Sequence, residues 1–583
     1  MTTAQSRAPR SSFRRPAAWT CGAVALGVAL FAQPATQART SQQGAVAAAP
    51  GPPASCDDLL LPPRNAKGQK VGPASCLMQE TPLRFEGRAF TRLDIGLDGT
   101  VDGYLAKTGD YKDYFTNGPD LVFPQTWGPR PIFFGVARYE RAKGAAMTVV
   151  YPADKTAWNG RVFVMVHGRG VSLKEGNLKP WNKNLDPVNP VGDLDKYDKL
   201  LMSKGYVVVK THRTSTEGLG EITATLEDGT TIDSIAFNDT AHYIMDFADV
   251  AKAAVVKRLG TPPVHMYMYG HSAGARIGHS LNYTPGLNVG RDGKRFFDGL
   301  LDDDPAAGTW YPVVLKDGKD VLLTTAADKA AFVPQIDVAH QIYNNIWPPH
   351  HPDWMSSSYL ENKRNNARIL RDKGIANYRM YEVRSISHSG GETYADGKKG
   401  DLEILDLSRL YDRFFDMLDA WADKGVAPPP THSDAAELGD ANHDGVIENA
   451  GLAFPEVACP LGVYYGYPET TSGATAFAAF TGKGIEPLNA KNVWIDMNGN
   501  GVWDYRETPT QAWRRMGLLQ ATETLTREKY VACVQSAADT LRKEGFFSDK
   551  TAEWYVTYAK TAELMAKDSA KDTGVRKLSK SDQ

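Results

Sequence analysis

The feature that most constrains the fold is a regular alternation of apolar strands and amphipathic helices in the middle of the chain. The run 162–166 is continuously apolar, which is typical of a strand in a parallel sheet covered on both faces. Helical spacing of apolar residues and flanking breakers predict the other elements. These are helices over 194–204, 239–259 and 407–421, and strands over 206–209, 264–269, 297–301, 331–336 and 378–383. Strands that alternate with helices form βαβ units, so the sequence predicts an α/β fold with a mostly parallel central sheet.

Length and charge limit the class of protein. The chain has 583 residues, enough for one large domain and a smaller companion. With 66 Lys and Arg against 68 Asp and Glu, the formal net charge is -2. Because such a chain has no overall basic field, we expect no nucleic-acid partner. The oligomeric state is left open.

Residues 1–38 are predicted to be a secretory signal peptide. Arg10, Arg14 and Arg15 precede an apolar run from Thr20 to Ala32, and small residues around Ala38 suit cleavage. The apolar run is too short to cross a bilayer, and no later segment is long and apolar enough. We therefore expect no membrane span, a secreted or periplasmic location, and an N-terminal linker over 39–80.

Four cysteines remain after this segment: Cys56, Cys76, Cys459 and Cys533. An even number in an exported chain predicts two disulfides, with four buried thiols as the alternative. Short closures favour Cys56 with Cys76 and Cys459 with Cys533.

The strand at 264–269 is followed by Gly270-His271-Ser272-Ala273-Gly274, which fits the G-x-S-x-G pattern. In that pattern a serine on a strained strand-to-helix turn exposes its Oγ as a nucleophile, and small neighbours let the backbone pass closely. The loop from His167 to Gly170 follows an earlier strand. It is predicted to supply backbone N–H groups at Gly168 and Arg169 to an oxyanion hole, together with the N–H of Ala273.

The base of a serine triad must be a histidine, and His388 follows the strand 378–383 in the position expected of it. His340, His350 and His351 are interpreted as residues of a pocket-lining or surface loop. Asp337 is the preferred acid, because it follows the apolar run 332–336 and would lie at the edge of the sheet. Asp302, Asp303 and Asp304 are the rivals, or else a solvated turn or an ion site.

Residues from about 80 to 570 resemble the secreted serine hydrolases of the α/β-hydrolase-domain type, distantly related to the tannase and feruloyl esterase group. The resemblance is carried by the segments 166–170, 270–274, 295–299, 381–383, 421–430 and 454–460. It implies the α/β-hydrolase fold and serine-esterase chemistry, with a catalytic domain over 81–430. The chain lacks the paired adjacent cysteines of tannases, so a gallate or ferulate substrate does not follow.

The C-terminal extension, 431–583, contains two segments that resemble EF-type calcium loops. The first places oxygen donors at positions 1, 3, 5, 7, 9 and 12 of a twelve-residue loop with glycine at position 6. Its ligands would be Asp496, Asn498, Asn500, the carbonyl of Val502, Asp504 and Glu507. The second begins in the same way but has Gly451 at position 12, and is either a weaker site or an empty turn. Its ligands would be Asp440, Asn442, Asp444, Val446 and Glu448.

Two classes of function follow from these features. The first is a secreted carboxylic-ester hydrolase with structural Ca²⁺ and no organic cofactor, acting on a small or polymeric ester, with peptidase or thioesterase activity as variants. The second is a calcium-dependent binding or anchoring protein on an inert hydrolase scaffold.

Overall fold

The computed structural model describes most of the chain between Val46 and Leu578. The described residues are 46–47, 54–60, 75–101, 121–125, 128–138, 142–167, 194–212, 221–226, 231–235, 237–283, 287–290, 292–305, 315–316, 319–320, 322–342, 358–387, 407–431, 451–459, 467–468, 475–476, 503–504, 510, 513–514, 517–561 and 577–578. By its internal contacts the chain divides into two units, Met1–Gly44 and Ala45–Gln583. The predicted signal peptide, 1–38, lies outside the described residues.

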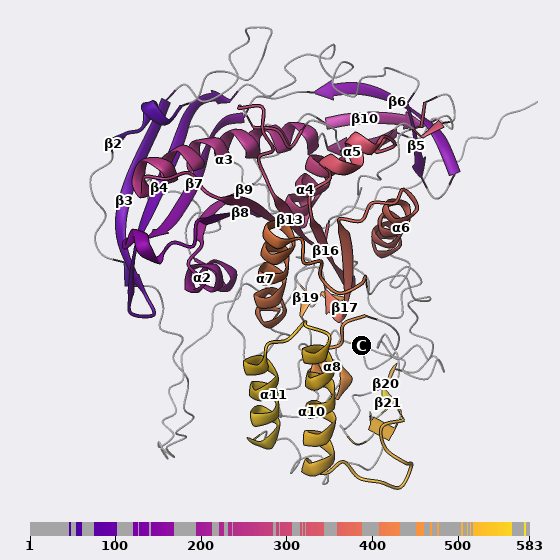
Figure 1. Cartoon of the computed structure of the whole chain (residues 1–583). Coiled ribbons are helices and arrows are strands. Elements are labelled where there is room, and N and C mark those ends of the chain that lie inside the picture. Colours follow the sequence, from indigo (N-terminus) through magenta and orange to yellow (C-terminus); the bar gives the residue numbers. More distant parts are fainter. Residues whose placement is uncertain are drawn as a thin grey trace, which may run out of the picture. The chain divides into compact units, whose positions relative to one another are not determined.

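Among the described residues, the main sheet has 11 strands (Figure 1). Its order is β1-β3-β4-β7-β9-β8-β12-β13-β16-β17, with β2 paired to β3. The strands are β1 (Val46–Ala47), β2 (Ala54–Ser55), β3 (Ser75–Phe85), β4 (Arg88–Val101), β7 (Ala142–Pro152), β8 (Arg161–His167), β9 (Val207–His212), β12 (His265–His271), β13 (Gly299–Asp303), β16 (Gln335–Ile342) and β17 (Tyr378–Ser387). From β9 to β17 neighbouring strands are parallel, whereas the pairs from β1 to β7, and β7 with β9, are antiparallel.

Each face of this sheet has its own hydrophobic core, because alternate residues of a strand point to opposite faces. In β8, Val162, Val164 and Val166 belong to one core, and Phe163 and Met165 to the other. Helices α3 (Phe237–Leu259) and α4 (Ala273–Tyr283) cover the first face, while α2 (Lys196–Ser203) and α7 (Ser408–Lys424) cover the second (Figure 1). This layering confirms the predicted α/β class.

Helix ends form where the sequence supplies caps. Asp195 caps α2 by accepting hydrogen bonds from the backbone N–H groups of Tyr197 and Asp198. At the C-terminus of α7, Gly425 adopts a left-handed conformation (φ 68°) that glycine tolerates. Two further helices, α5 (Ala326–Ala331) and α6 (Ser358–Asp372), flank β16 in the chain, and α6 packs on β16 and β17.

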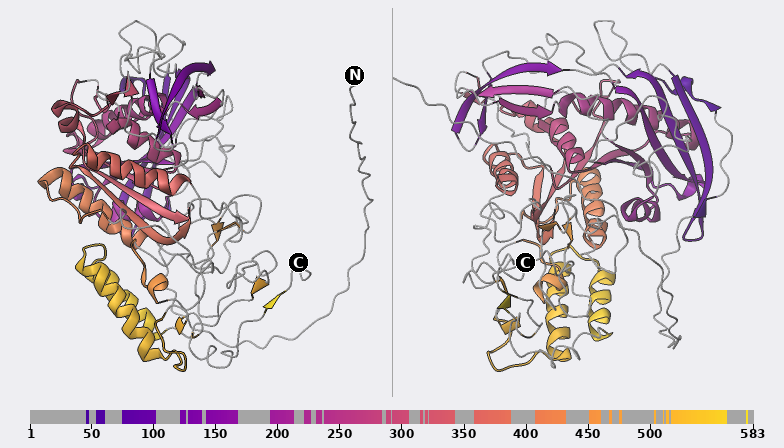
Figure 2. Two further views of the ribbon diagram at one scale, coloured as in Figure 1. Left: turned by 90° about the vertical axis from the view of Figure 1, so that its right-hand side faces the viewer. Right: turned by 180° about the vertical axis from the view of Figure 1, so that it is seen from behind.

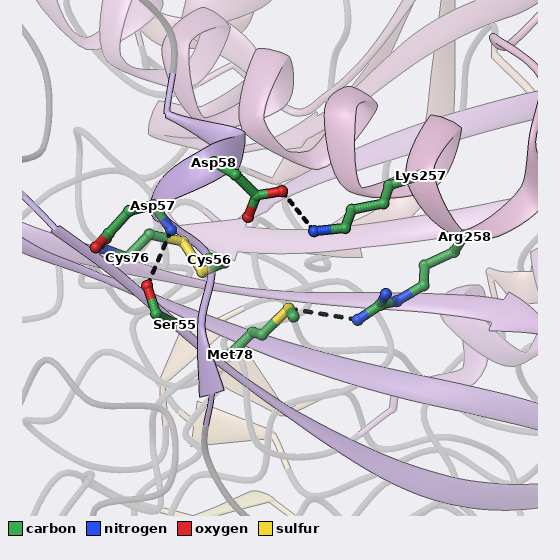
Figure 3. Close-up of a disulfide and its surroundings, with 8 residues drawn as sticks. All are labelled: Ser55, Cys56, Asp57, Asp58, Cys76, Met78, Lys257 and Arg258. Atoms are coloured by element: carbon green, nitrogen blue, oxygen red, sulfur yellow. Dashed lines mark hydrogen bonds and ion pairs between the residues drawn. A yellow bond between two sulfur atoms is a disulfide. The ribbon is translucent and has the colours of Figure 1, made fainter.

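The N-terminal segment is fastened to the first face by a disulfide. Cys56 and Cys76 are bonded, with their Cα atoms 4.9 Å apart, at the short helix η1 (Asp57–Leu59) and the start of β3. Figure 3 shows Lys257 of α3 forming an ion pair with Asp58 beside this bond. Because β3 begins at Ser75, the sheet starts inside the stretch that the sequence suggested was a linker.

A second, six-stranded sheet with the order β11-β10-β6-β5-β14-β15 was not expected. Its longest strands are β5 (Leu121–Gln125), β6 (Gly128–Arg138), β10 (Glu221–Leu226) and β11 (Thr231–Ile235). Two short strands, β14 (Leu315–Lys316) and β15 (Lys319–Asp320), complete it.

The C-terminal helices share the core of the second face. Helices α10 (Arg527–Lys543) and α11 (Asp549–Thr561) lie side by side (Figure 2). Phe546, between them, packs edge-on against Tyr381 of β17, with ring centroids 5.0 Å apart. A second disulfide joins Cys459, after α8 (Pro455–Ala458), to Cys533 of α10. Both predicted cysteine pairings are therefore confirmed.

In the part of the chain that the structure describes, no helix is long and apolar enough to cross a membrane. The two disulfides are typical of proteins that fold outside the cytoplasm.

Candidate active site

Ser272 is the single residue between β12 and α4, on the turn that the sequence predicted. Its φ is +58°, a left-handed backbone conformation that a residue other than glycine rarely adopts. The backbone N–H of Ser272 donates to the carbonyl of Asp303 at 2.9 Å, which holds the turn against the end of the neighbouring strand β13. Strain of this kind persists where the surrounding structure fixes it, and it is common at functional sites.

The two glycines of the motif make this turn possible. A Cβ on Gly270 would lie 2.4 Å from backbone atoms of Gly274, and a Cβ on Gly274 would lie 2.4 Å from the carbonyl oxygen of Val166. Backbone therefore packs on backbone, from the end of β8 through α4 to the end of β12. The same contact places the start of α4 beside Val166, directly before the loop with the predicted oxyanion donors.

A buried polar cluster surrounds Asp303 next to Ser272. Its carboxylate lies 2.9 Å from Nδ1 of His271 and 2.9 Å from Nε2 of His340, and accepts a hydrogen bond from the hydroxyl of Tyr269 at 2.7 Å. Burial alone would raise the pKa of Asp303, but His340 and His271 hold that pKa well below its usual value. Asp303 is thus an anion over the whole neutral range.

Asp304 and His340 extend this cluster. Asp304 accepts a hydrogen bond from the backbone N–H of His340 and forms an ion pair with Lys363 of α6. Burial would lower the pKa of His340, but the charges of Asp304 and Asp303 raise it above its ordinary value. His340 is fully buried in β16. Its predicted place in a pocket-lining or surface loop is therefore wrong, because the strand continues to Ile342 instead of ending at Ile336.

Asp337 does not lie at the end of its strand. It is the third residue of β16, because the strand begins only at Gln335 and continues to Ile342, whereas the predicted strand over 331–336 ended before it. Its carboxylate is 2.9 Å from Nε2 of His279 and accepts a hydrogen bond from Tyr378 at 2.6 Å. The physical argument that favoured Asp337 as the triad acid is therefore lost, although its role stays a prediction.

The three consecutive carboxylates are not a solvated turn either. Asp302, Asp303 and Asp304 are all buried at the end of β13. Alternation sends Asp302 to the face of α4, where it lies against Gly278, and sends Asp303 to the opposite face. Sequence reasoning missed this separation and did not identify His271 and Lys363 as members of the cluster. For His271, its position directly before Ser272 was the one signal in the sequence.

Several predicted site residues lie outside the described residues: His388, Gly168 and Arg169. The same is true of all residues of the 440–451 loop before Gly451. Of the 496–507 loop, the structure describes Trp503 and Asp504, which form strand β20 paired with β21 (Lys577–Leu578).

A mostly parallel central sheet covered on both faces, with a strained serine between a central strand and the following helix, defines the α/β-hydrolase class. The profile of the alpha/beta hydrolase domain family matches residues 145–557, more than half of the chain. The chain therefore belongs to this family. A search of curated proteins found no match.

Solved structures with some similarity include esterases and a depolymerase, all at low identity. Esterase 2 of Thermogutta terrifontis is 13% identical over 51% of this chain and 96% of its own, with a TM-score of 0.28. A poly(3-hydroxybutyrate) depolymerase of Bordetella parapertussis is 14% identical over 51% and 90%, with a TM-score of 0.26. A fungal esterase of Rhizomucor miehei is 13% identical over 47% and 77%, with a TM-score of 0.25. The assignment rests on the family match.

Proposed function

We propose that this protein is an exported serine esterase that hydrolyses a carboxylic ester. The observation that carries the proposal is the left-handed Ser272 on a turn where neither flanking glycine has room for a Cβ. Such a turn costs free energy. A serine held there presents Oγ at the N-terminus of α4, where the helix dipole favours an anion. A serine needed only for packing would gain nothing from it.

The oxyanion would be held by backbone N–H groups. Ala273 is the first residue of α4, so its N–H has no partner within the helix and can bind a ligand. The contact between Gly274 and Val166 supports a second donor from Gly168 or Arg169, because the chain leaves β8 next to that helix start. Two donors aimed at the developing charge are worth several kcal/mol of transition-state stabilisation, roughly 3 kcal/mol each.

His388 is proposed as the base, because it directly follows β17, and loops after parallel strands open at the same edge of the sheet as Ser272. It would take the proton from Oγ as Ser272 attacks the ester carbonyl and give it to the leaving alcohol. Water then attacks the acyl-enzyme with the same base, and the carboxylic acid leaves.

For the acid we now favour Asp303 over Asp337, since Asp303 lies at the edge of the sheet beside Ser272 and keeps its charge. Asp353 is a further candidate, as the single carboxylate in residues 343–357 that follow β16.

The test is hydrolysis of p-nitrophenyl esters of increasing acyl length by the mature protein, with covalent labelling by a fluorophosphonate. Ser272→Ala should fold normally, lose labelling and lose roughly 10³-fold or more in kcat. His388→Ala should match that loss. Asp303→Asn, Asp337→Asn and Asp353→Asn then rank the acids, since the true acid should cost the most activity. Wild-type kcat in a folded Ser272→Ala protein would overturn the proposal.

Peptidase and thioesterase substrates belong in the same panel, because serine peptidases and thioesterases use the same catalytic apparatus as serine esterases.

A calcium-binding role is proposed for the 496–507 loop, which contributes β20 and has the full donor pattern. We propose that Ca²⁺ there stabilises the C-terminal region, without a part in the chemistry.

A further inference from the structure

A second polar cluster lies beneath α4, on the sheet face opposite to that of the Asp303 carboxylate. His279 of α4, Asp302 of β13 and Asp337 of β16 come together there, and all three are buried. Asp302 and Asp337 are direct neighbours in the register of the two strands. Each of the three residues can offer one nitrogen or oxygen atom such that these atoms lie within 4.8 Å of one another.

The surroundings of Asp337 hold its carboxylate in a fixed position. Its carboxylate accepts hydrogen bonds from Tyr378 and from Nε2 of Gln335, at 2.6 and 2.8 Å. The side-chain oxygen of Gln335 accepts in turn from Asn282 at 2.8 Å, which fixes the Gln335 amide so that its nitrogen faces Asp337. A carboxylate has about four lone-pair positions, so one stays open after these bonds and the contact with His279.

Asp302, unlike Asp337, lacks hydrogen-bond partners for its carboxylate among the described residues. Within the described part of the chain, neither of its carboxylate oxygens has a hydrogen-bond partner, although the residue is fully buried. The same holds for Nδ1 of His279, whose Nε2 faces Asp337. A charge-bearing group in this state needs a counter-charge or a proton, because an unpaired buried carboxylate is very costly.

The room for this carboxylate is made by Gly278. A Cβ at position 278 would lie 2.0 Å from Oδ1 of Asp302, so α4 and the acid can be neighbours only because residue 278 is glycine. A proton on Asp302 would remove its charge, but one proton cannot satisfy both of its oxygens and Nδ1 of His279. A cation bound by one atom from each of the three side chains would neutralise the charge of Asp302 and use ligand atoms that lie within reach of one another.

We propose that His279, Asp302 and Asp337 form a binding site for one divalent transition-metal ion, Zn²⁺ in the first place. One imidazole and two carboxylates are a ligand set that Zn²⁺ accepts, with Mn²⁺ as the nearest competitor. Asn282 and Gln335 would be the outer residues that orient the ligands. The ion would fasten α4 to β13 and β16 and so stabilise the helix that begins next to Ser272. Its place on the opposite face from Asp303 makes its role structural.

The test is elemental analysis of tag-free protein, produced with Zn²⁺ in the medium and dialysed against metal-free buffer, which counts Zn²⁺ separately from Ca²⁺. We expect about one equivalent of Zn²⁺ in wild type and its loss in Asp302→Asn, which keeps the size of the side chain. The matched control is Asp94→Asn, which also removes a buried carboxylate but lies in β4, and it should retain the ion. A chelator that binds Zn²⁺ far more tightly than Ca²⁺, such as TPEN, should lower the melting temperature of wild type and of Asp94→Asn, but not that of Asp302→Asn.

A second measurement covers the case in which Asp302→Asn does not fold. Wild type produced with Co²⁺ in place of Zn²⁺ should show visible absorption bands, which His279→Gln should lose. The proposal is overturned if wild type refolded with Zn²⁺ holds no transition metal, or if Asp302→Asn retains the ion. It is also overturned if metal-free wild type melts no lower than the loaded protein. Activity is not a readout here, so these outcomes do not depend on the esterase proposal.

Discussion

The contact between Gly274 and Val166 gives a sharp prediction for catalysis. A Cβ on Gly274 would lie 2.4 Å from the Val166 carbonyl oxygen, whereas ordinary contact begins at 3.4 Å. Gly274→Ala must therefore move the start of α4 by about 1 Å (3.4 − 2.4) relative to β8. Overpacking of this kind costs about 1–3 kcal/mol of stability.

The expected effect on activity is larger than the effect on stability. A displacement of about 1 Å in the parts that align nucleophile and oxyanion donors costs on the order of 100-fold in rate. We therefore expect kcat for a p-nitrophenyl ester to fall about 100-fold in Gly274→Ala, while far-UV circular dichroism stays that of wild type. Because the serine itself is retained, fluorophosphonate labelling should be slower, but still present.

The control is Gly425→Ala at the end of α7. Gly425 has φ +68°, and a Cβ at this position would meet nothing within 4 Å, so alanine there is strained without a clash. A left-handed alanine costs about 1–2 kcal/mol, which matches the stability loss of Gly274→Ala. Its kcat should stay that of wild type. A folded Gly274→Ala protein with wild-type kcat, or equal losses in the two variants, would refute the reasoning.

Three further predictions concern stability. Replacing Cys459 and Cys533 by serine should lower the free energy of unfolding by roughly 4 kcal/mol, and replacing Cys56 and Cys76 should lower it by roughly 3 kcal/mol. The difference arises because the first disulfide closes 74 residues and the second closes 20. Urea denaturation of both double variants measures this difference, and the reverse order would contradict the prediction. The pKa of His340 is raised in the folded protein, so the stability from its protonation is present below pH 6.5 and is lost as pH rises through the folded pKa. The stability difference between wild type and His340→Gln, which leaves Asp303, Asp304, Lys363 and His271 in place, should therefore shrink from pH 6 to pH 9; a difference that does not change with pH would contradict this. Chelation of Ca²⁺ should lower the melting temperature of wild type but not of Asp496→Ala, with kcat at low temperature unchanged; equal melting temperatures with and without bound Ca²⁺ would reject the site.

The sequence by itself determined the layers and the strained turn that carries the proposed nucleophile. A continuous apolar strand such as 162–166 is typical of a parallel sheet covered on both faces, and this pattern together with the alternation of strands and helices sufficed for the fold class. Ser272 could be identified from its own neighbours, because the strained turn needs small residues at fixed short distances in the chain. The two disulfides were likewise found from short closures, Cys56 with Cys76 and Cys459 with Cys533.

The partners of the acidic residues were decided by the tertiary structure alone. Whether Asp337 lies at the end of a strand or inside it depends on where β16 begins and ends, and the strand runs from Gln335 to Ile342 where the local pattern predicted 331–336. Asp302 and Asp303 are adjacent in the chain, yet the pleat of β13 sends one toward His279 and the other toward His271. No local pattern contains this information, because the histidines that meet each carboxylate come from other strands and helices, brought there by the order of the sheet.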